Sequence, residues 1–402
     1  MTAFPPNKKQ EQRLIGRRGL RRNAWCEERP PFETIALVLQ GGGALGAYQA
    51  GVYDGLAASN LHPDWVAGIS IGSVNAAIIA GNRPEERAER LRDFWREVTR
   101  DFSWDIAPIR FLLTHGDLAR SATNQASAFR GLLYGASGFF EPRLPPPWLQ
   151  PSGSLEATSF YDTAKLRTTL ERLIDFDRIN SGETRLSLGA VNVRTGNFVY
   201  FDTATHTIRP EHVMASGALP PGFPAVEIDG EHYWDGGLVS NTPLSWIVEG
   251  KPGDTLVFQV DLWSSRGEFP RSLADALTRE KEIRYSSRTR SVTDRFKHLQ
   301  ELRNACACVF DGLPEQLRTS PEAQMLHAEA SRSVYNIVHL IYRSKEFEAD
   351  SRDYEFSRLS MEERWQAGYN DTLRTLRHPE VLERPEGLET VFTFDLAVDG
   401  RE

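Results

Sequence analysis

Cysteine is scarce in this sequence: only Cys26, Cys306 and Cys308 occur among the 402 residues. Three cysteines are too few for a disulfide framework, and a low cysteine content is typical of a reducing compartment. The pair Cys306 and Cys308 has no second pair and no histidine at the spacing of a zinc site, so we expect inert thiols and no bound metal. The sequence therefore predicts a cytoplasmic protein.

Long apolar runs are missing as well. The longest strictly aliphatic run, Ile-Ala-Leu-Val-Leu at residues 35–39, is far shorter than the roughly 20 apolar residues that cross a bilayer. Residues 1–30 carry basic charges but no apolar segment ahead of a small-residue cleavage site, which argues against a secretory signal. We expect no transmembrane helix.

The balance of charge is acidic, with 47 lysines and arginines against 55 aspartates and glutamates, a net charge of −8. Residues 1–30 reverse this balance, since they hold eight basic and three acidic side chains. The rest of the chain is therefore strongly acidic. Its negative electrostatic field does not attract the phosphates of a nucleic acid, so we expect no nucleic-acid partner. The basic segment reads as a solvated, disordered tail. The alternative is contact with anionic lipid headgroups at the inner membrane surface.

Short buried strands alternate with helices in the first part of the chain. Residues 35–40 and 65–69 are aliphatic runs typical of buried strands, and residues 47–58 and 72–80 place apolar side chains at helical spacing. This alternation with short turns predicts an α/β fold with a mostly parallel central sheet and helices on both faces. Further strands are predicted at 186–193, 198–201, 225–228, 232–234 and 256–260, with a helix at 162–176. The first two of these strands flank a hairpin turn at 195–197, and the next two flank one at 229–230.

The sequence predicts three parts: a basic tail at residues 1–30, an α/β domain at 31–265 and a mostly helical C-terminal region at 266–402. Within the last part, residues 336–342 read as a strand, which either belongs to that region or extends the first sheet. The proline-rich loop at 139–151 carries Phe139, Phe140 and Trp148. Two interpretations stay open for it: an apolar lid or membrane contact, or aromatic side chains that pack onto the domain.

A glycine-rich loop follows the first predicted strand: Gly41, Gly42, Gly43, Ala44, Leu45 and Gly46. A loop between a buried strand and a helix points backbone N–H groups outward at the positive end of the helix dipole, so it is suited to negative charge. The G-x-G-x-x-G pattern alone also suggests a dinucleotide fold, in which an acidic residue ends the second strand. Here Asp64 precedes that strand, which places it at the wrong edge of the sheet.

The second predicted strand runs into the pattern G-x-S-x-G, made by Gly68, Ser70 and Gly72. Strand, turn and helix around such a serine form a nucleophile elbow, in which the glycines let strand and helix approach closely. Together with the glycine loop upstream, this makes Ser70 the candidate nucleophile.

A nucleophilic serine needs a base, because its hydroxyl reacts poorly at neutral pH. The histidines beyond Asp235 lie within predicted helices or strands, and none is flanked by glycines: His298, His327, His339 and His378. The candidate base is Asp235, which follows a predicted strand and precedes Gly236 and Gly237. An aspartate of a hairpin turn is the alternative interpretation of Asp235, and a histidine-assisted triad with His339 or His298 also stays open.

In this order, the glycine loop, the serine elbow and the Asp-Gly-Gly element resemble the patatin-like phospholipases. The resemblance covers about residues 35–245 and includes Ala-Ser-Gly-Ala-Leu-Pro at 215–220, and the remainder is similar to bacterial members with an additional helical C-terminal region. It implies a three-layer patatin-like fold, hydrolysis of carboxylic esters of lipids and no cofactor. It also implies a Ser70–Asp235 dyad and an oxyanion hole at Gly41, Gly42, Gly43, Ala44 and Gly46.

One residue departs from the family pattern. Many members have arginine or lysine before the last glycine of the oxyanion loop, where this chain has Leu45. The backbone donors survive this change, but we expect no cation near the developing oxyanion, and hence a lower turnover or a less anionic substrate. A protein that senses lipid on the same scaffold without hydrolysing it is the second functional hypothesis.

Overall fold

The computed structural model describes residues 29–99, 117–250, 253–286, 289–344, 348, 351–386 and 389–396. Almost all of the predicted basic tail lies outside these ranges. No helix within them combines the length and the hydropathy needed to span a membrane.

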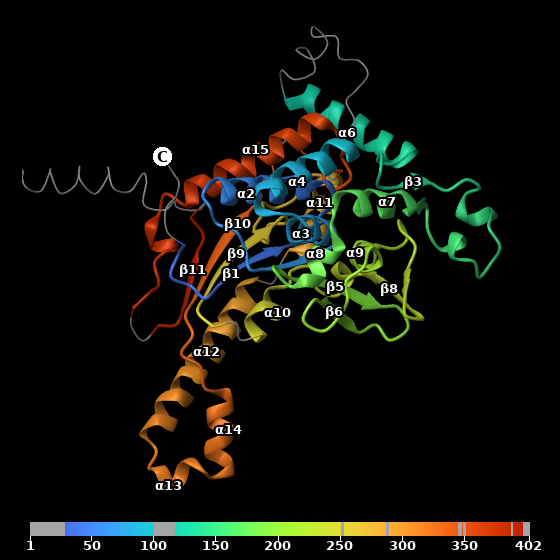
Figure 1. Ribbon diagram of the computed structural model, residues 1–402. Helices are drawn as coiled ribbons and strands as arrows, with labels where there is room; N and C mark the ends of the chain where they lie inside the picture. Colours follow the sequence, from blue (N-terminus) through green and yellow to red (C-terminus); the bar gives the residue numbers. More distant parts are fainter. Residues whose placement is uncertain are drawn as a thin grey trace, which may run out of the picture.

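A nine-stranded sheet forms the centre of the described chain, in the order β11-β10-β9-β1-β2-β5-β8-β7, with β6 paired to β5 (Figure 1). Its six strands from β11 to β5 are parallel, whereas β6, β7 and β8 are antiparallel to their neighbours. The strands are β1 (Thr34–Leu39), β2 (Trp65–Ile69), β5 (Arg185–Asn192), β6 (Phe198–Asp202), β7 (Val226–Ile228), β8 (Glu231–Asp235), β9 (Thr255–Asp261), β10 (Tyr335–Ile341) and β11 (Val391–Phe394). The predicted mostly parallel α/β fold is thereby confirmed.

Helices cover both faces of this sheet. Along β1, Ile35, Leu37 and Leu39 pack into the core shared with α2 (Ala47–Ala58), α3 (Ile71–Ala80) and α4 (Pro84–Val98). The alternate residues Ala36 and Val38 face a second core, shared with α10 (Leu244–Glu249) and α12 (Thr289–Gly312). Side chains on alternate sides of a strand explain why β1 is an uninterrupted apolar run.

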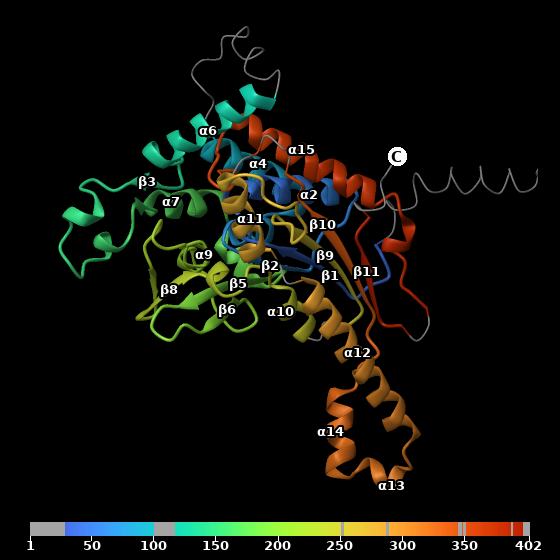
Figure 2. The same ribbon diagram turned by 180° about the vertical axis from the view of Figure 1, so that it is seen from behind.

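The C-terminal region is mostly helical, as expected, but it is not separate from the sheet. Its strands β10 and β11 extend the sheet beyond β9, so the strand predicted at 336–342 belongs to the central sheet. β11 was not predicted. The helices are α11 (Leu273–Tyr285), α12, α13 (Glu315–Arg318), α14 (Pro321–Glu329) and α15 (Arg358–Thr375). The outer part of α12, with α13 and α14, projects away from the body as an arm (Figures 1 and 2). A domain boundary at 265/266 remains a proposal.

Helix α15 lies directly on α2, the helix that follows the glycine loop (Figure 2). A Cβ atom on Gly51 would lie 1.9 Å from the carbonyl oxygen of Trp365, and one on Gly368 would lie 2.1 Å from that of Tyr48. The two backbones are therefore in contact, which only glycine permits. The Trp365 indole also donates to Asp54 Oδ2 at 2.9 Å. This crossing places the C-terminal region beside the glycine loop.

The segment between α4 and β5 contains α6 (Asp117–Tyr134), β3 (Glu141–Pro142), β4 (Tyr161–Asp162), α7 (Ala164–Leu173) and α8 (Phe176–Ser181). In its proline-rich loop, Phe139 and Phe140 are 8% and 7% exposed and pack against Phe223. Leu144 and Trp148, by contrast, are 89% and 73% exposed. The phenylalanines thus pack onto the domain, as the second interpretation has it, and the tip is an exposed apolar surface, for which a lid or a membrane contact stays a prediction.

Candidate active site

Ser70 occupies a strained turn between β2 and α3. Its φ of 57° and ψ of −127° lie in a region that non-glycine residues rarely adopt, at a cost of roughly 1–3 kcal/mol. The backbone N–H of Ser70 donates to the carbonyl oxygen of Ser216 at 3.0 Å and to its Oγ at 3.2 Å. Ser216 ends α9 (Pro210–Ser216), so the turn is held from a neighbouring helix.

The two glycines of the elbow fit spaces that exclude any side chain. A Cβ atom on Gly68 would lie 2.3 Å from the carbonyl oxygen of Gly72, and one on Gly72 would lie 2.3 Å from the carbonyl oxygen of Leu39. Strand β2 and helix α3 therefore approach to backbone contact, and α3 also touches the end of β1. This is the close approach that the G-x-S-x-G pattern predicts.

Asp235 lies at the end of β8 and is 1% exposed. Its Oδ1 accepts the backbone N–H of Gly237 at 2.7 Å, and the Ser70 hydroxyl also acts on the carboxyl group. Burial raises the pKa of Asp235 to about 7, while the interactions with Ser70 and Gly237 partly oppose this rise. Ser70 and Asp235 are 165 positions apart in sequence, and the sheet brings them together.

Gly236 and Gly237 shape the turn that follows Asp235. A Cβ atom on Gly236 would lie 2.6 Å from the carbonyl oxygen of Gly189 on β5, so this position requires glycine. The Asp-Gly-Gly element forms a short 3₁₀ turn after β8, not the turn of a hairpin. The hairpin in this region is formed instead by β7 and β8 around Asp229 and Gly230.

The glycine loop lies against the nucleophile. A Cβ atom on Gly41 would lie 3.0 Å from the Cβ of Ser70 and 2.3 Å from Oδ1 of Asn241. The carbonyl oxygen of Gly41 accepts Nδ2 of Asn241 and Nε1 of Trp263, each at 3.0 Å. The loop then turns at Gly43, whose φ is +56°, into a 3₁₀ turn (η1, Gly43–Gly46) that leads into α2.

The backbone N–H groups of this loop have different partners. The N–H of Gly41 donates to the Asn241 carbonyl at 3.3 Å, and that of Ala44 donates to the Asp353 carbonyl at 2.7 Å. Within the described ranges, no acceptor is found for the N–H groups of Gly42 and Gly43. The Ala44 amide is thus bonded to the C-terminal region in this structure, and its assignment to an oxyanion hole stays a prediction.

Four residues that hold this site were not found from the sequence: Asn241, Trp263, Asp353 and Arg364. Arg364, on α15, donates from Nη1 to the carbonyl oxygen of Ala44 at 3.2 Å. Leu45 itself is fully buried in the core. A guanidinium thus reaches the loop at Ala44 from 320 positions along the chain, whereas the absence of a cation near the developing oxyanion stays a prediction. No local pattern around Arg364 or Asp353 signals these contacts.

The histidines show no contact with the dyad within the described residues. His339 lies on β10 with Nδ1 4.0 Å from Oδ2 of Asp261, and burial lowers its pKa to about 4. His298, His327 and His378 are exposed on C-terminal elements. The groups that act on the Asp235 carboxyl are Ser70 and Gly237. Asp64, as predicted, lies before β2, where it accepts the N–H of Ile35 at the opposite end of that strand from Ser70.

The solved structures that are similar to the chain include proteins from two bacteria. The chain is similar to VipD from Legionella pneumophila at 14% identity, with 86% of this chain and 67% of that chain covered and a TM-score of 0.39. It is similar at 14% identity to a chain of the ExoU–SpcU complex from the type III secretion system of Pseudomonas aeruginosa, with 75% and 68% covered and a TM-score of 0.26. A search of curated proteins found no match.

Two protein families match the chain. The family described as "Patatin-like phospholipase" matches residues 37–245, slightly more than half of the chain, and this span runs from the first strand through the serine elbow to the Asp-Gly-Gly turn. The family described as "Patatin phospholipase" matches residues 283–387, most of the C-terminal region. The chain therefore belongs to the patatin-like phospholipase family.

Proposed function

We propose that this protein is a serine acyl hydrolase that cleaves carboxylic ester bonds of lipids, with Ser70 as nucleophile and Asp235 as base. The observation that supports this most directly is the buried carboxyl group of Asp235, on which the Ser70 hydroxyl acts and whose pKa burial raises to about 7. A base is most effective when its pKa lies near the working pH. Buried carboxyl groups with raised pKa values are typical of functional sites.

The reaction proceeds in two steps. In the first, Asp235 takes the proton of the Ser70 hydroxyl while Oγ attacks the acyl carbonyl, and the proton passes to the departing alcohol. In the second, Asp235 takes a proton from water, which attacks the acyl-serine carbonyl; the bond to Ser70 Oγ breaks, Asp235 passes the proton to that oxygen, and the fatty acid is released. Each step returns Asp235 to its starting protonation state, and neither requires a metal or an organic cofactor.

The oxyanion of both steps is assigned to the N–H groups of Gly42 and Gly43. The sequence suggested Gly41, Gly42, Gly43, Ala44 and Gly46, but the amides of Gly41 and Ala44 are bonded elsewhere. A single oxyanion donor typically lowers the barrier by about 2.7–4 kcal/mol, so two donors supply a substantial part of the rate enhancement. Gly41 and Gly46 contribute shape: each has neighbours within 3.0 Å of where a Cβ atom would lie.

Hydrolysis of a chromogenic fatty-acyl ester tests the proposal. Ser70→Ala is expected to abolish turnover and Asp235→Asn to lower kcat by at least about 100-fold, in line with general-base catalysis. Ser240→Ala, which changes a serine five residues after Asp235, is the matched control and is expected to keep full activity. Undiminished activity in Ser70→Ala would overturn the mechanism. His339→Gln at full activity would remove a histidine-assisted triad.

The rival function is a lipid sensor that binds without turnover. A fluorophosphonate probe separates the two functions, because it forms a covalent bond only with an activated serine. Labelling of the wild type at Ser70 supports the hydrolase, whereas a folded, unlabelled wild type supports the sensor. The raised pKa of Asp235 favours the hydrolase, since a sensor has no need of a base beside the serine.

We also propose a cytoplasmic protein that meets membranes at the surface, through residues 1–30 and the tip of the 139–151 loop. The exposed side chains Leu144, Trp148 and Leu149 support the second contact. Exposed apolar side chains also lie at the end of α6: Phe129, Leu132, Leu133 and Tyr134. The Tyr161 hydroxyl donates to the carbonyl oxygen of Leu132 at 2.9 Å, which joins this helix to β4, the partner of Pro142 in the loop.

A further inference from the structure

Ala44, in the glycine loop, is held on both sides by the C-terminal region. Its N–H donates to the carbonyl oxygen of Asp353 at 2.7 Å, and its carbonyl oxygen accepts Nη1 of Arg364 at 3.2 Å. The same Nη1 donates to the carbonyl oxygen of Glu355 at 3.2 Å. A Cβ atom on Gly43 would lie 2.1 Å from the Asp353 carbonyl oxygen, so the two backbones touch there. We call these contacts the Ala44 clamp.

Burying the charged Arg364 side chain costs desolvation free energy. It is 1% exposed and lies 3.8 Å from a carboxylate oxygen of Glu348 and 3.8 Å from one of Glu355. The Tyr342 hydroxyl in turn donates to both oxygens of Glu348 at 2.7 Å. Apolar side chains of similar volume usually fill such a position at least as stably as buried ions do. What this guanidinium provides and an apolar side chain would not are the hydrogen bonds that join Ala44 to Glu355, together with the charge that faces the two carboxylates.

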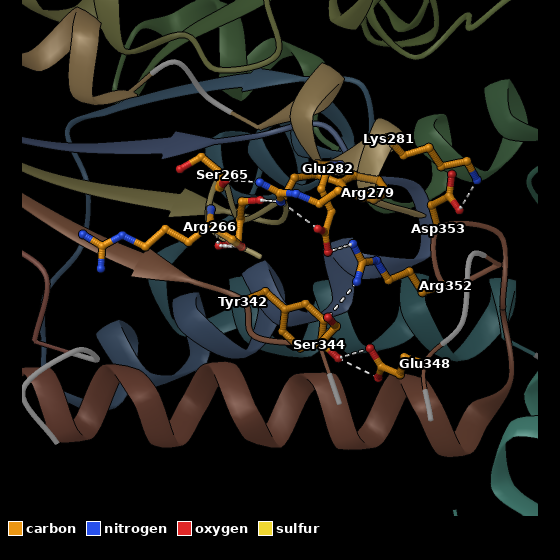
Figure 3. Close-up of polar contacts among 12 residues, drawn as sticks. Ser265, Arg266, Arg279, Lys281, Glu282, Tyr342, Ser344, Glu348, Arg352 and Asp353 are labelled. Atoms are coloured by element: carbon orange, nitrogen blue, oxygen red, sulfur yellow. Dashed lines mark hydrogen bonds and ion pairs between the residues drawn. The ribbon is translucent and has the colours of Figure 1, made fainter. Parts of the chain in front are cut away.

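The segment that carries Asp353 is anchored to α11, as Figure 3 shows. Asp353 Oδ1 lies 3.3 Å from Nζ of Lys281, and Arg352 donates to Glu282 and to Ser344, each at 2.7 Å. Both ionic contacts link helix α11 to the stretch after β10. The Asp353 carbonyl is therefore presented to Ala44 by a fixed segment.

Fixing Ala44 also fixes the two amides that precede it. Three consecutive glycines have wide backbone freedom, and rotation of one peptide is enough to turn an N–H away from an oxyanion. The carbonyl oxygen of Gly42 accepts the N–H of Leu45 at 3.2 Å, which closes the turn only if Ala44 keeps its orientation. On the other side, Asn241 and Trp263 hold Gly41. Gly42 and Gly43 thus lie between two anchored residues.

We propose that Arg364 is a positioning residue for the oxyanion hole, so that the C-terminal region is part of the hydrolytic unit. This inference rests on the proposed ester hydrolysis at Ser70. Arg364 orients the amides of Gly42 and Gly43 through Ala44 without touching the substrate. It also brings a guanidinium to the loop whose own fifth position, Leu45, is apolar and buried.

The test is Arg364→Lys, which keeps the charge but loses the planar group that reaches the carbonyl oxygens of Ala44 and Glu355. The matched control is Arg87→Lys. Arg87 is also buried, and it donates to the carbonyl oxygen of Asn82 and to the hydroxyl of Thr184, the residue just before β5. Full-length enzyme is titrated with a fluorophosphonate, and kcat and KM for a chromogenic ester are measured per reactive serine. The inhibition constant of a trifluoromethyl ketone, which forms a tetrahedral oxyanion on serine, is the second readout.

For Arg364→Lys we expect kcat to fall about 10- to 100-fold with KM nearly unchanged. This fall is at most as large as the one that follows removal of a single oxyanion donor. The trifluoromethyl ketone is expected to bind more weakly by a similar factor, and Arg87→Lys to match the wild type in both. If the role of Arg364 is merely structural, Arg364→Lys lowers the melting temperature and the fraction of protein with a reactive serine, but leaves kcat per reactive serine and the inhibition constant unchanged. That result would overturn the proposal.

Tyr342→Phe keeps the proposal testable if Arg364→Lys does not fold. It removes only the hydroxyl that holds Glu348 against Arg364, so we expect the same two readouts to shift in the same direction by a smaller factor. Wild-type kcat and inhibition in Tyr342→Phe would then count against the positioning role. A wild type that neither hydrolyses esters nor reacts with the probe contradicts the proposed hydrolysis itself, which is a different outcome.

Discussion

The N–H of Ser70 donates to both oxygens of Ser216, the carbonyl oxygen at 3.0 Å and Oγ at 3.2 Å. Ser216 Oγ donates in turn to the carbonyl oxygen of Gly189 on β5 at 2.6 Å. The strained backbone of the nucleophile is thus bonded through one buried hydroxyl to the strand next to β2. A positive φ at a serine persists only where its surroundings enforce it.

Ser216→Ala is expected to lower both stability and rate. Loss of the hydroxyl leaves the buried carbonyl oxygen of Gly189 without this donor, at a cost of about 1–3 kcal/mol, and relaxes the turn that aims Ser70. We expect kcat to fall about tenfold with little change in KM. Ser181→Ala, which removes an exposed hydroxyl on α8, is the control. Full kcat per reactive serine in Ser216→Ala would contradict this role.

The rate of hydrolysis should rise with pH through the pKa of Asp235, about 7. Only the ionised carboxylate accepts the serine proton, so kcat/KM below this pKa is expected to fall about tenfold per pH unit. The measurement is a kcat/KM profile from pH 5 to pH 9 with an uncharged ester. Asp235→Asn is expected to show a low rate without this inflection. A flat wild-type profile over the same range would exclude Asp235 as the titrating base.

The same pKa sets a stability trend of the opposite sign. Because the folded pKa of Asp235, about 7, lies above its ordinary 3.8, the native state binds more protons than the unfolded state between these values. This group therefore stabilises the protein less as pH rises from about 4 to about 7. Asp235→Asn lacks this penalty, so its melting temperature relative to the wild type is expected to increase over that pH range. A constant difference at all pH values would argue against the raised pKa.

Gly72→Ala should disrupt the elbow. The new methyl group would lie 2.3 Å from the carbonyl oxygen of Leu39, which is backbone and has little room to move. We expect a loss of about 1–3 kcal/mol in the free energy of unfolding, together with loss of fluorophosphonate labelling. Gly312→Ala is the control, since no atom lies within 4 Å of its added methyl group. Urea denaturation and probe labelling on both variants decide the matter.

The loop tip is expected to contribute to binding of anionic vesicles. Replacing the exposed Leu144 and Trp148 by serine removes apolar area without disturbing the buried Phe139 and Phe140, so vesicle co-sedimentation should fall while the melting temperature is kept. Met325→Ser, at an exposed apolar position of the projecting arm, is the control. Deletion of residues 1–30 is expected to lower binding further, and this contribution should weaken with salt. Unchanged sedimentation in both changed proteins would remove the membrane contact.

The sequence predicted the catalytic half of the fold closely, because its signals are local. An aliphatic run that stops at three glycines, a G-x-S-x-G turn and hairpins around Gly196 and Asp229 each specify a backbone over a few residues. The structure has β1, β2, β9 and both hairpins within a few residues of the expected places. β11 was not predicted, because Val391–Phe394 is too short to give a clear strand pattern and is a strand through its pairing with β10.

The supports of the site could not be predicted, because they depend on contacts between distant residues. Arg364 occurs in a charged helical stretch, where an arginine normally faces solvent. Only the crossing of α15 over α2 buries it beside Ala44. Asp353 acts through its backbone carbonyl, so its side chain carries no signal of the contact. The same limit explains why the bond from the Ala44 amide to Asp353 was not predicted.

The chain order of these contacts has a consequence for biosynthesis. Ser70 and Asp235 are translated well before Asp353 and Arg364, and β9 must wait for β10 to complete its hydrogen bonds. A nascent chain that ends near residue 250 carries the dyad but not the Ala44 clamp. If the clamp orients the oxyanion hole, a partly synthesised chain is a poor hydrolase, and the cell's lipids meet an active enzyme only after Arg364 has left the ribosome.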